Sequence, residues 1–369
     1  MRIRFLQCFL CRLKFRSGNV QQVRQPQRCG CGGSVVVHYD WSRVNLSWSR
    51  LRSRPFTHWR YKEFFPPIRE PLEMGEGGTP IVPSIKHTGW YFKIEGQNPT
   101  GSFKDRGSAV EISLARQQRA RRVVLASTGN MGASVAAYCA RAGLECEVVL
   151  PKNTNPEKIS EIASFGAAIT KVSGDYTKAS TIAFSKSKQK GWTLAGDYTY
   201  RREGEKSLAF EIADQLGLVD YVVVPVGNGT MISGVWKGFK ELYAARLIHK
   251  LPALIAVQAA GCMPIVQALK SKTPIKPVIP RTMAHAVACG APLDGDLALL
   301  SIVESRGKAI AVTDPEIIQA RRMLARTEGL DAEPSGAASV AGALKLKLPR
   351  SALTVFILSG SGLKDLGNV

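Results

Sequence analysis

From residue 80 onward, short runs of β-branched and other apolar residues alternate with stretches whose apolar residues recur at helical spacing. Strands of this kind are covered on both faces, and their alternation with helices is typical of largely parallel sheets. We therefore predict an α/β fold with two doubly wound domains. The expected strands are residues 90–95, 122–127, 146–151, 168–172, 192–196, 221–227, 254–259 and 352–360, and the expected helices are residues 104–118, 130–142, 155–165, 176–189, 205–216, 230–245 and 314–328.

The length of the chain, 369 residues, exceeds what one small core needs, so two domains with an appendage are expected. No apolar run approaches the roughly 18 residues that a membrane-spanning helix requires. Four cysteines are scattered in apolar segments, which is typical of free core thiols in a reducing cytosol; they are Cys139, Cys146, Cys262 and Cys289. We predict a cytoplasmic protein that does not enter a membrane.

The other four cysteines cluster near the N-terminus. Cys8 and Cys11 form a C-x2-C pair, and after a 17-residue spacer Cys29 and Cys31 form a C-x-C pair. Paired cysteines on hairpins gather four thiolates around a metal, so residues 1–40 are predicted to form a zinc-ribbon-like module with structural zinc. A metal-free ribbon and a labile disulfide are the alternatives. The first 39 residues contain no acidic residue, but their ordered Cys and Gly spacing favours a folded module over a transit peptide.

The net charge is +21, and residues 1–70 carry 14 Lys and Arg against three acidic residues. Such asymmetry indicates polyanion binding in some proteins and attraction for phosphorylated metabolites in others. Residues 41–70 interleave aromatic residues with arginines, which can stack on nucleic acid. We favour the alternative, an arm whose rings pack on the main body while the arginines reach water. Nucleic acid is therefore not the expected partner.

Three strand-to-helix junctions are rich in Gly, Ser, Thr and Asn: residues 125–134, 224–234 and 358–365. In α/β folds, ligands bind at such carboxyl ends of strands. The second junction contains "GNGT" (227–230), whose backbone N–H groups at a helix start can hold an anion; a tight turn is the alternative. Because it is neither G-x-G-x-x-G nor G-K-[ST], dinucleotide and nucleoside-triphosphate sites are disfavoured.

One lysine, Lys104 in "NPTGSFKDRGS", stands between a tight turn and an expected helix. Ser102 as the cap and Asp105 in the first turn would explain a helix start with Lys104 pointing to water. Alternatively, the amine is held there for chemistry. A desolvated amine near the positive end of a helix has its ammonium form disfavoured, so it can act as a nucleophile and a base.

The ordered motifs of the chain resemble those of the fold type II pyridoxal-phosphate enzymes, and most closely the threonine synthase family, over residues 70–365. The motifs are "GEGGTP", "NPTGSFKDRG", "STGN", "REGEKSLAFE", "PVGNGT", "EPSGAAS" and "SGSGLKD". The Cys-rich head is similar to the zinc-ribbon-like N-terminus of many archaeal-type members. The resemblance implies a large cofactor-binding domain from residues 41–122 and 217–369, a small domain from residues 123–216, and a homodimer.

The resemblance also implies which residues bind pyridoxal 5'-phosphate. Lys104 matches the Schiff-base lysine, and Asn130 matches the residue that bonds the phenolic oxygen of the ring. The cofactor phosphate is expected on Gly227, Asn228, Gly229 and Thr230. Ser359 matches the hydroxyl that faces the pyridine nitrogen, where a hydroxyl suits elimination and replacement better than transamination.

For the substrate, the resemblance assigns the carboxylate to Ser127 and Thr128, and the phosphate to Arg201 with Lys206. A charged helix start with an ordinary Glu203–Lys206 pair is the alternative for the last two. The chain differs from many family members at Met131 and in "AGDYTY" (195–200), where an Asn/Ser-rich stretch is common.

The implied reaction converts O-phospho-L-homoserine, a small phosphorylated amino acid, and water to L-threonine and phosphate. The alternatives within this chemistry are a cysteate- or cysteine-synthase-like enzyme and a threonine/serine dehydratase. A different class, an RNA-binding or partner-binding protein that uses the basic N-terminus, is the least favoured hypothesis.

Overall fold

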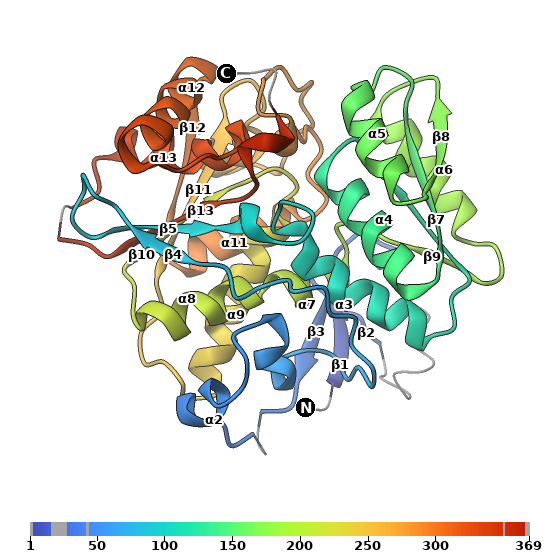
Figure 1. The fold of residues 1–369 in the computed structure, drawn as a ribbon, viewed down its shortest axis with the longest axis horizontal. Coiled ribbons are helices and arrows are strands. Elements are labelled where there is room, and N and C mark those ends of the chain that lie inside the picture. The colour runs from blue at the N-terminus through green and yellow to red at the C-terminus, as the bar shows by residue number, and fades with distance from the viewer. Residues whose placement is uncertain (1–2, 16–27, 42–43, 350, 366–369) are drawn as a thin grey trace. The chain divides into compact units, whose positions relative to one another are not determined.

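The computed structural model describes residues 3–15, 28–41, 44–349 and 351–365 (Figure 1). Residues 16–27 of the predicted Cys-rich module lie outside the described part. The chain forms two compact units, which are described separately. The first unit comprises Met1–Ser42, Lys62–Glu76 and Lys104–Gly204, and the second comprises Arg43–Tyr61, Gly77–Phe103 and Glu205–Val369. The domain boundaries expected from the resemblance stay a prediction.

The larger sheet of the first unit has four parallel strands in the order β8-β7-β6-β9. These strands are β6 (Arg122–Ala126), β7 (Glu145–Pro151), β8 (Ala168–Val172) and β9 (Trp192–Leu194). The helices of this part are α3 (Lys104–Gln117), α4 (Asn130–Ala142), α5 (Pro156–Ser164) and α6 (Tyr176–Lys186) (Figure 1). Val124 and Val149 pack with Ala179 and Ala183 of α6, while α4 contacts β6 and β7.

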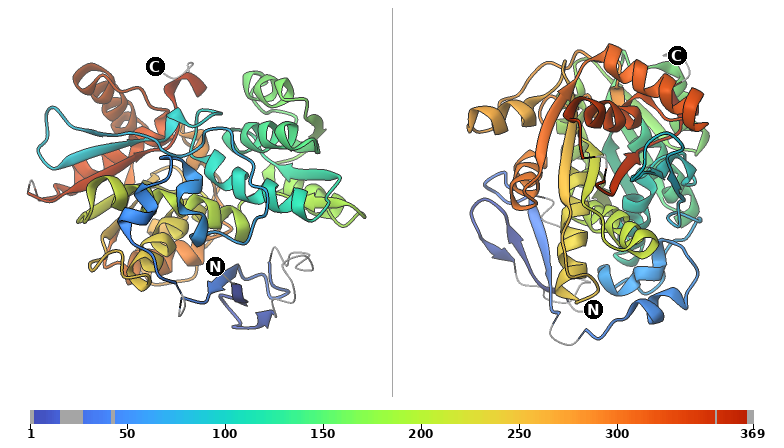
Figure 2. Two further views of the ribbon diagram at one scale, coloured as in Figure 1. Left: turned by 60° about the horizontal axis from the view of Figure 1, so that its bottom comes forward. Right: turned by 90° about the vertical axis from the view of Figure 1, so that its left-hand side faces the viewer.

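The N-terminal part of the first unit is a ribbon of three antiparallel strands, drawn in blue in Figure 2. The strands are β1 (Ile3–Cys8), β2 (Lys14–Phe15) and β3 (Val35–Tyr39). The ribbon makes hydrogen bonds to the short helix α7 (Thr199–Glu205). Val35 O accepts hydrogen bonds from Thr199 Oγ1 (3.1 Å) and Arg202 Nη1 (3.0 Å), and Tyr39 Oη donates to Glu203 Oε2 (2.7 Å).

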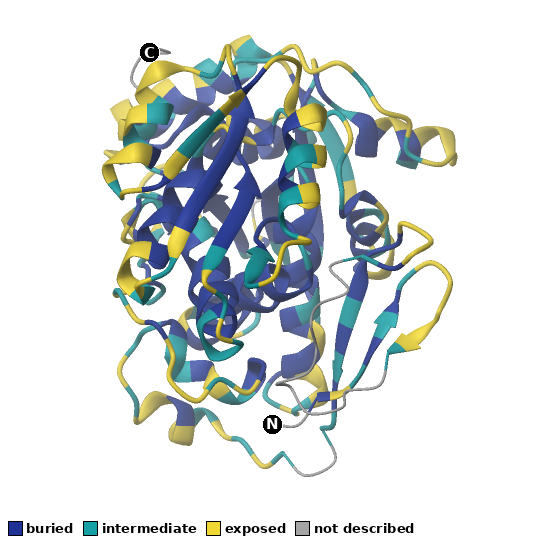
Figure 3. Ribbon diagram, turned by 90° about the vertical axis from the view of Figure 1, so that its right-hand side faces the viewer, coloured by how far each residue is buried: buried dark blue, intermediate teal, exposed yellow. Residues whose placement is uncertain are grey.

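The second unit has a six-stranded sheet in the order β12-β11-β10-β13-β5-β4, parallel except for the β4–β5 pair. The strands are β4 (Ile81–Pro83), β5 (Trp90–Ile94), β10 (Tyr221–Pro225), β11 (Ala253–Ala259), β12 (Lys308–Val312) and β13 (Thr354–Leu358). The α-helices are α2 (Trp48–Arg52), α8 (Ser207–Leu216), α9 (Thr230–Ala244), α10 (Pro264–Ser271), α11 (Gly295–Glu304), α12 (Asp314–Met323) and α13 (Pro334–Leu346). Figure 3 shows that buried residues dominate the strands, whereas exposed residues gather on loops and outer helix faces.

The predicted fold class is confirmed, and each predicted strand and helix has an observed counterpart. Two predicted helices are interrupted. The helix expected at residues 205–216 begins at Ser207, after a break at Lys206 that separates it from α7, and the helix expected at residues 314–328 changes to a π-helical turn at Leu324. Strands β4 and β12 and helices α2, α7, α10, α11 and α13 were not among the predicted elements.

The packing interpretation of the aromatic and arginine-rich arm is confirmed for residues 48–61. Trp48 Nε1 donates to Leu247 O (2.9 Å). The carboxylate of Asp214 receives hydrogen bonds from the arm's Arg52, Arg60 and Tyr61; their lengths are 2.7, 2.8 and 2.8 Å. Because rings and guanidinium groups of the arm are bound to the body, this segment is part of the second unit. Among the residues that the structure describes, no helix is long and apolar enough to span a membrane.

Candidate active site

Lys104 is the first residue of α3, and it follows a turn in which Gly101 has a φ of +78°. This φ lies in the left-handed region that glycine adopts without strain. The Lys104 side chain is 15% exposed, and its Nζ lies 3.1 Å from Asp197 Oδ1. The amine is therefore nearly buried and has a carboxylate partner in the same unit.

The predicted cap of this helix is wrong. Ser102 lies two residues before α3, one position too early for a cap, and its buried Oγ makes no hydrogen bond to any described residue. Its backbone instead pairs with Gly360 in the second unit. Asp105 accepts a hydrogen bond from Ser134 Oγ (2.6 Å). Strand-like pairing before the helix, not side-chain capping, thus fixes the approach of the chain to Lys104.

Arg201 of α7 is fully buried and binds α3 along one side. Its Nη1 donates to Lys104 O (3.1 Å), and its Nη2 donates to Ser108 Oγ (3.0 Å) and to Glu111 Oε2 (2.8 Å). A Cβ at Gly107 would lie 2.6 Å from Arg201 Cγ, so the glycine lets the arginine lie against the helix. Burial raises the pKa of Glu111, and the Arg201 charge opposes this effect.

The predicted carboxylate loop follows β6, an inner strand, at the end of the four-stranded sheet where the parallel strands have their carboxyl ends. Ser127 is buried, and its Oγ accepts hydrogen bonds from the N–H groups of Gly129 (3.3 Å) and Gly132 (2.8 Å). Thr128 is exposed, and Asn130 is buried as the first residue of α4. The Ser127 hydroxyl therefore closes the turn, while Thr128 is exposed.

The predicted phosphate loop lies between β10 and α9 in the second unit. Gly229 has a φ of +92°, and a Cβ on it would lie 2.7 Å from Asp294 O, so only glycine fits. The Asn228 side chain accepts hydrogen bonds from the backbone N–H of Leu293 and from Cys289 Sγ. Thr230 begins α9, and its buried Oγ1 has no hydrogen-bond partner among the described residues. The N–H groups of a glycine turn at a helix start can donate hydrogen bonds to an anion, and the Thr230 hydroxyl can donate another.

Ser359 follows β13 in the second unit and is buried. Its Oγ donates to Glu333 Oε1 (2.9 Å), a carboxylate that precedes α13. Phe103, the residue before Lys104, donates its backbone N–H to Ser359 O (3.0 Å). Lys206 is also in this unit, where it is fully buried and its Nζ lies 2.8 Å from Glu241 Oε2.

The structure thus brings Lys104 and Arg201 together in the first unit, and it adds Asp197 and Glu111, which the sequence did not identify. In the second unit it adds Glu333 beside Ser359. Asp197 lies within "AGDYTY", so the departure of this segment from the family pattern was a usable signal. Glu333 opens the "EPSGAAS" motif, which was a signal of the same kind, whereas Glu111 carried none.

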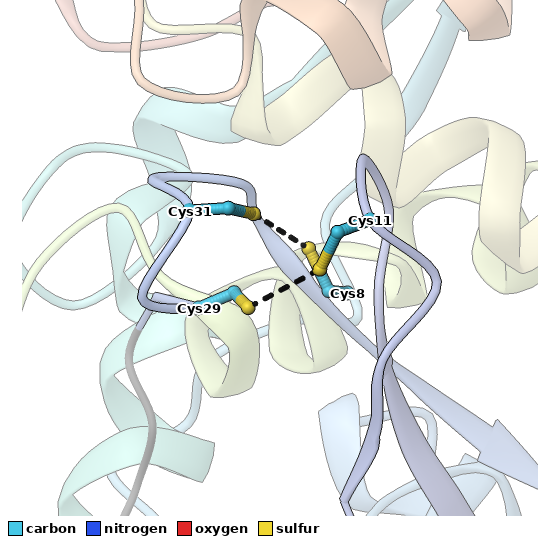
Figure 4. Close-up of side chains that lie close together, drawn as sticks. All are labelled: Cys8, Cys11, Cys29 and Cys31. Atoms are coloured by element: carbon cyan, nitrogen blue, oxygen red, sulfur yellow. Dashed lines mark hydrogen bonds between the residues drawn. The ribbon is translucent and has the colours of Figure 1, made fainter.

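The four N-terminal cysteines come together in the ribbon (Figure 4). All four sulfurs lie within 4.8 Å of one another, with Cys8–Cys31 and Cys11–Cys29 separations of 3.5 Å. Four Zn–S bonds of about 2.3 Å in a tetrahedron place sulfurs about 3.8 Å apart, so the cluster fits zinc. All are free thiols, and the separations exceed the roughly 2 Å of a disulfide bond. A hydrogen bond from the Gly33 backbone lowers the pKa of Cys31 to about 7.

A family model described as "Pyridoxal-phosphate dependent enzyme" matches residues 72–360. The chain belongs to this pyridoxal-phosphate-dependent family. It is 40% identical to a threonine synthase of Methanocaldococcus jannaschii over 361 residues, which cover 91% of this chain and 88% of the relative. A threonine synthase of Methanosarcina acetivorans is 39% identical over 351 residues, with 91% and 87% covered.

Solved structures share the fold of this family. Maize serine racemase superposes with a TM-score of 0.69 at 24% identity, covering 77% of this chain and 88% of its own. A threonine deaminase from Solanum lycopersicum superposes with a TM-score of 0.66 at 24% identity, covering 77% and 83%. Both confirm the fold alone.

Membership of the family gives this protein pyridoxal 5'-phosphate as its cofactor. Two observations fit that group. The 227–230 loop of the second unit offers a glycine turn, the start of a long helix and the Thr230 hydroxyl to a phosphate. In the first unit, Lys104 presents a nearly buried primary amine that can bond a carbonyl carbon.

Proposed function

We propose that this protein is a threonine synthase, which converts O-phospho-L-homoserine and water to L-threonine and phosphate. The observation that carries the proposal is the identity of 40% to a threonine synthase over 91% of the chain. The partly buried Lys104 amine supports it, because the reaction needs one basic nitrogen to move protons between substrate carbons.

When bound, the cofactor supplies an electron sink for charge that develops on the substrate. We propose that Lys104 anchors it covalently and, once released, carries protons. Asn130 orients the ring, Gly227, Asn228, Gly229 and Thr230 hold its phosphate, and Ser359 faces the ring nitrogen. The Glu333 carboxylate, which accepts the Ser359 proton, orients that hydroxyl.

For the substrate, we propose that Ser127, Thr128 and the backbone after them bind the carboxylate. Arg201 has a second candidate role besides the predicted phosphate contact: it holds α3 in place. This role is supported by its full burial and by its bonds to Lys104 O and Glu111. A phosphate contact would require those bonds to be exchanged. The part of Lys206 in substrate binding stays a prediction.

The assay that tests the proposal compares three reactions of the cofactor-loaded protein. We expect threonine and phosphate from phosphohomoserine at a kcat/KM at least 100-fold above that for phosphate release from phosphoserine, and above that for 2-oxobutyrate formation from threonine. Faster turnover of phosphoserine would support a cysteate- or cysteine-synthase-like enzyme, and faster 2-oxobutyrate formation would support a dehydratase. Either result would overturn the proposal.

We infer that Cys8, Cys11, Cys29 and Cys31 hold one structural zinc ion. The tetrahedral spacing of the sulfurs supports this inference. Cys8 pairs with Val35 in the ribbon sheet, and Val35 O binds α7, so the metal would also support α7.

We expect one zinc ion per chain by elemental analysis, and less than one-tenth of that in the Cys29→Ser variant. The variant should also melt at a lower temperature, because a ligand at 100 times its Kd stabilises a fold by about 2.7 kcal/mol. Cys146→Ala, in the same unit but outside the cluster, is the matched control and should keep its zinc. Zinc-free wild-type protein with an unchanged melting temperature would contradict the inference.

We further propose a cytoplasmic location and a homodimer. The eight free cysteines support a reducing compartment. Sedimentation of the purified chain would test the dimer directly.

A further inference from the structure

The carboxylate of Asp197 is the partner of the Lys104 amine, and none of the roles described above involves it. Asp197 Oδ1 lies 3.1 Å from Lys104 Nζ. The Asp197 side chain is 8% exposed and that of Lys104 is 15% exposed, so water screens this pair only weakly. The two residues are separated by 93 positions in the chain but belong to the same compact unit.

The backbone beside Asp197 is fixed by a buried ion pair. Gly196 donates its N–H to Glu111 Oε1 (3.0 Å), and Gly196 O accepts a hydrogen bond from Arg201 Nε (3.0 Å). Glu111 and Arg201 are themselves joined at 2.8 Å, and both are almost completely buried. Gly196 has a φ of +146°, in the region that favours glycine. Both backbone polar groups of Gly196, the residue before Asp197, are therefore bound: the N–H to Glu111 of α3, and the carbonyl to Arg201, which also bonds α3.

The strand register places Asp197 at the edge of the sheet where ligands bind. Strand β9 runs parallel to β6, with Leu194 opposite Val124, and Ala195 N–H donates to Val124 O (2.9 Å). Asp197 therefore follows β9 at the carboxyl edge from which Ser127 follows β6. Carboxyl ends of parallel strands are the usual ligand positions in such sheets.

We propose that Asp197 is the charge partner of Lys104 during the reaction. It stabilises the protonated amine whenever Lys104 has taken a proton from the substrate. This inference deepens the proposed function and rests on Lys104 as the residue that moves protons.

The proton balance of this step is simple. A proton leaves a substrate carbon and binds the lone pair of Lys104 Nζ, while the bonding electrons stay with the substrate. The ammonium that forms is paired with the Asp197 carboxylate, so the pair carries no net charge. Returning the proton to another substrate carbon restores the neutral amine. A carboxylate within about 4 Å favours the charged form of an amine.

Several ionisable groups near this pair have contacts of their own. Glu111 and Arg201 form the buried pair described above. Asp105, next to Lys104, accepts a hydrogen bond from Ser134. Burial raises the pKa of the Tyr198 hydroxyl to about 12, and the charge of Arg28 opposes this rise. Tyr198 thus stays neutral near pH 7, whereas the Asp197 carboxylate bonds the amine.

The test measures the pKa of Lys104 in the full-length chain freed of cofactor. The rate at which acetic anhydride labels Lys104 is followed by mass spectrometry as a function of pH. We expect the midpoint to fall by at least about one unit in Asp197→Asn. Asp175→Asn is the matched control, because it removes the same charge from an exposed helix start in the same unit. The labelling midpoint of Asp175→Asn should equal that of the wild type. The midpoint of Asp197→Glu, which keeps a carboxylate, should lie close to the wild-type value.

A midpoint in Asp197→Asn equal to that of the wild type would overturn the inference. If that variant does not fold, Asp197→Ser provides the same comparison with a smaller neutral side chain. In the holoenzyme, Asp197→Asn should also move the limb of the kcat-against-pH profile that reports the Lys104 proton, in the same direction and by a similar number of pH units. The labelling midpoint does not involve a substrate. It therefore separates failure of this inference from failure of the proposed function. If only the proposed function fails, the wild type forms no threonine, but the labelling midpoint of Asp197→Asn still differs from that of the wild type.

Discussion

Replacing Lys104 with alanine is expected to lower the rate of threonine formation by more than about 10³-fold, because general acid–base catalysis alone contributes about 10²–10⁴-fold and the variant also lacks the amine that we propose as the covalent anchor of the cofactor. The structure supplies the reason: the first residue of α3 presents a nearly buried amine. The measurement is initial rate at saturating phosphohomoserine, together with the visible absorption of the bound cofactor, which should disappear.

Lys178→Ala is the control for this prediction. Lys178 lies in the first turn of α6 on the surface of the same unit, so its loss should leave both the rate and the spectrum unchanged. A Lys104→Ala protein that retains the cofactor absorption and turns over at a rate near that of the wild type would exclude Lys104 as the anchoring residue.

Replacing Arg201 with alanine is expected to have the largest effect on stability. Removing one partner of a buried ion pair costs about 3–5 kcal/mol in the free energy of unfolding. Here the change leaves the Glu111 carboxylate buried without its cation, and Lys104 O and Gly196 O each lose a donor. Urea unfolding of the wild type and of Arg201→Ala measures the difference in their free energies of unfolding.

The surface pair of Arg122 and Glu145 provides the matched control, since Arg122 and Glu145 are 37% and 62% exposed. Arg122→Ala should cost no more than about 1 kcal/mol. Equal costs for the two substitutions would show that the buried pair does not support α3.

The pH dependence of this loss has a definite sign. Burial raises the pKa of Glu111 in the folded state, and Arg201 is the main group that opposes the rise. In Arg201→Ala, the folded protein therefore binds the Glu111 proton more tightly than the unfolded chain does. The penalty appears as the pH rises through the ordinary glutamate pKa of about 4.3 and is fully present above the raised value. The variant should recover part of its stability at acidic pH.

Much of the fold could be predicted because it depends on local patterns. The runs that became β6, β7, β10 and β11 are β-branched and bounded by turn residues, and they proved to be buried parallel strands. Strand β12 was missed because it lies at the edge of its sheet, begins with Lys308 and is only partly buried. Helix α13 is buried from Pro334 to Ala343, so it has no polar face to create a helical period.

The candidate site was predictable to the extent that glycine, hydroxyl and lysine positions carry local signatures. Lys104 stands behind a glycine turn, and the 227–230 loop stands at a helix start. The partners of these groups depend on tertiary contacts and were not predictable. Glu111 has the composition of a solvated helix face, yet it is buried against Arg201, and Asp197 reaches Lys104 only because β9 lies beside β6.

The most direct test of the proposed function follows heavy oxygen from labelled water during turnover of phosphohomoserine. Elimination of phosphate followed by addition of water breaks the carbon–oxygen bond. We therefore expect mass spectrometry to find the label in the hydroxyl group of threonine and none in the released phosphate. Label in the phosphate with unlabelled homoserine as the product would reveal simple phosphate-ester hydrolysis and would contradict the proposal that this protein is a threonine synthase.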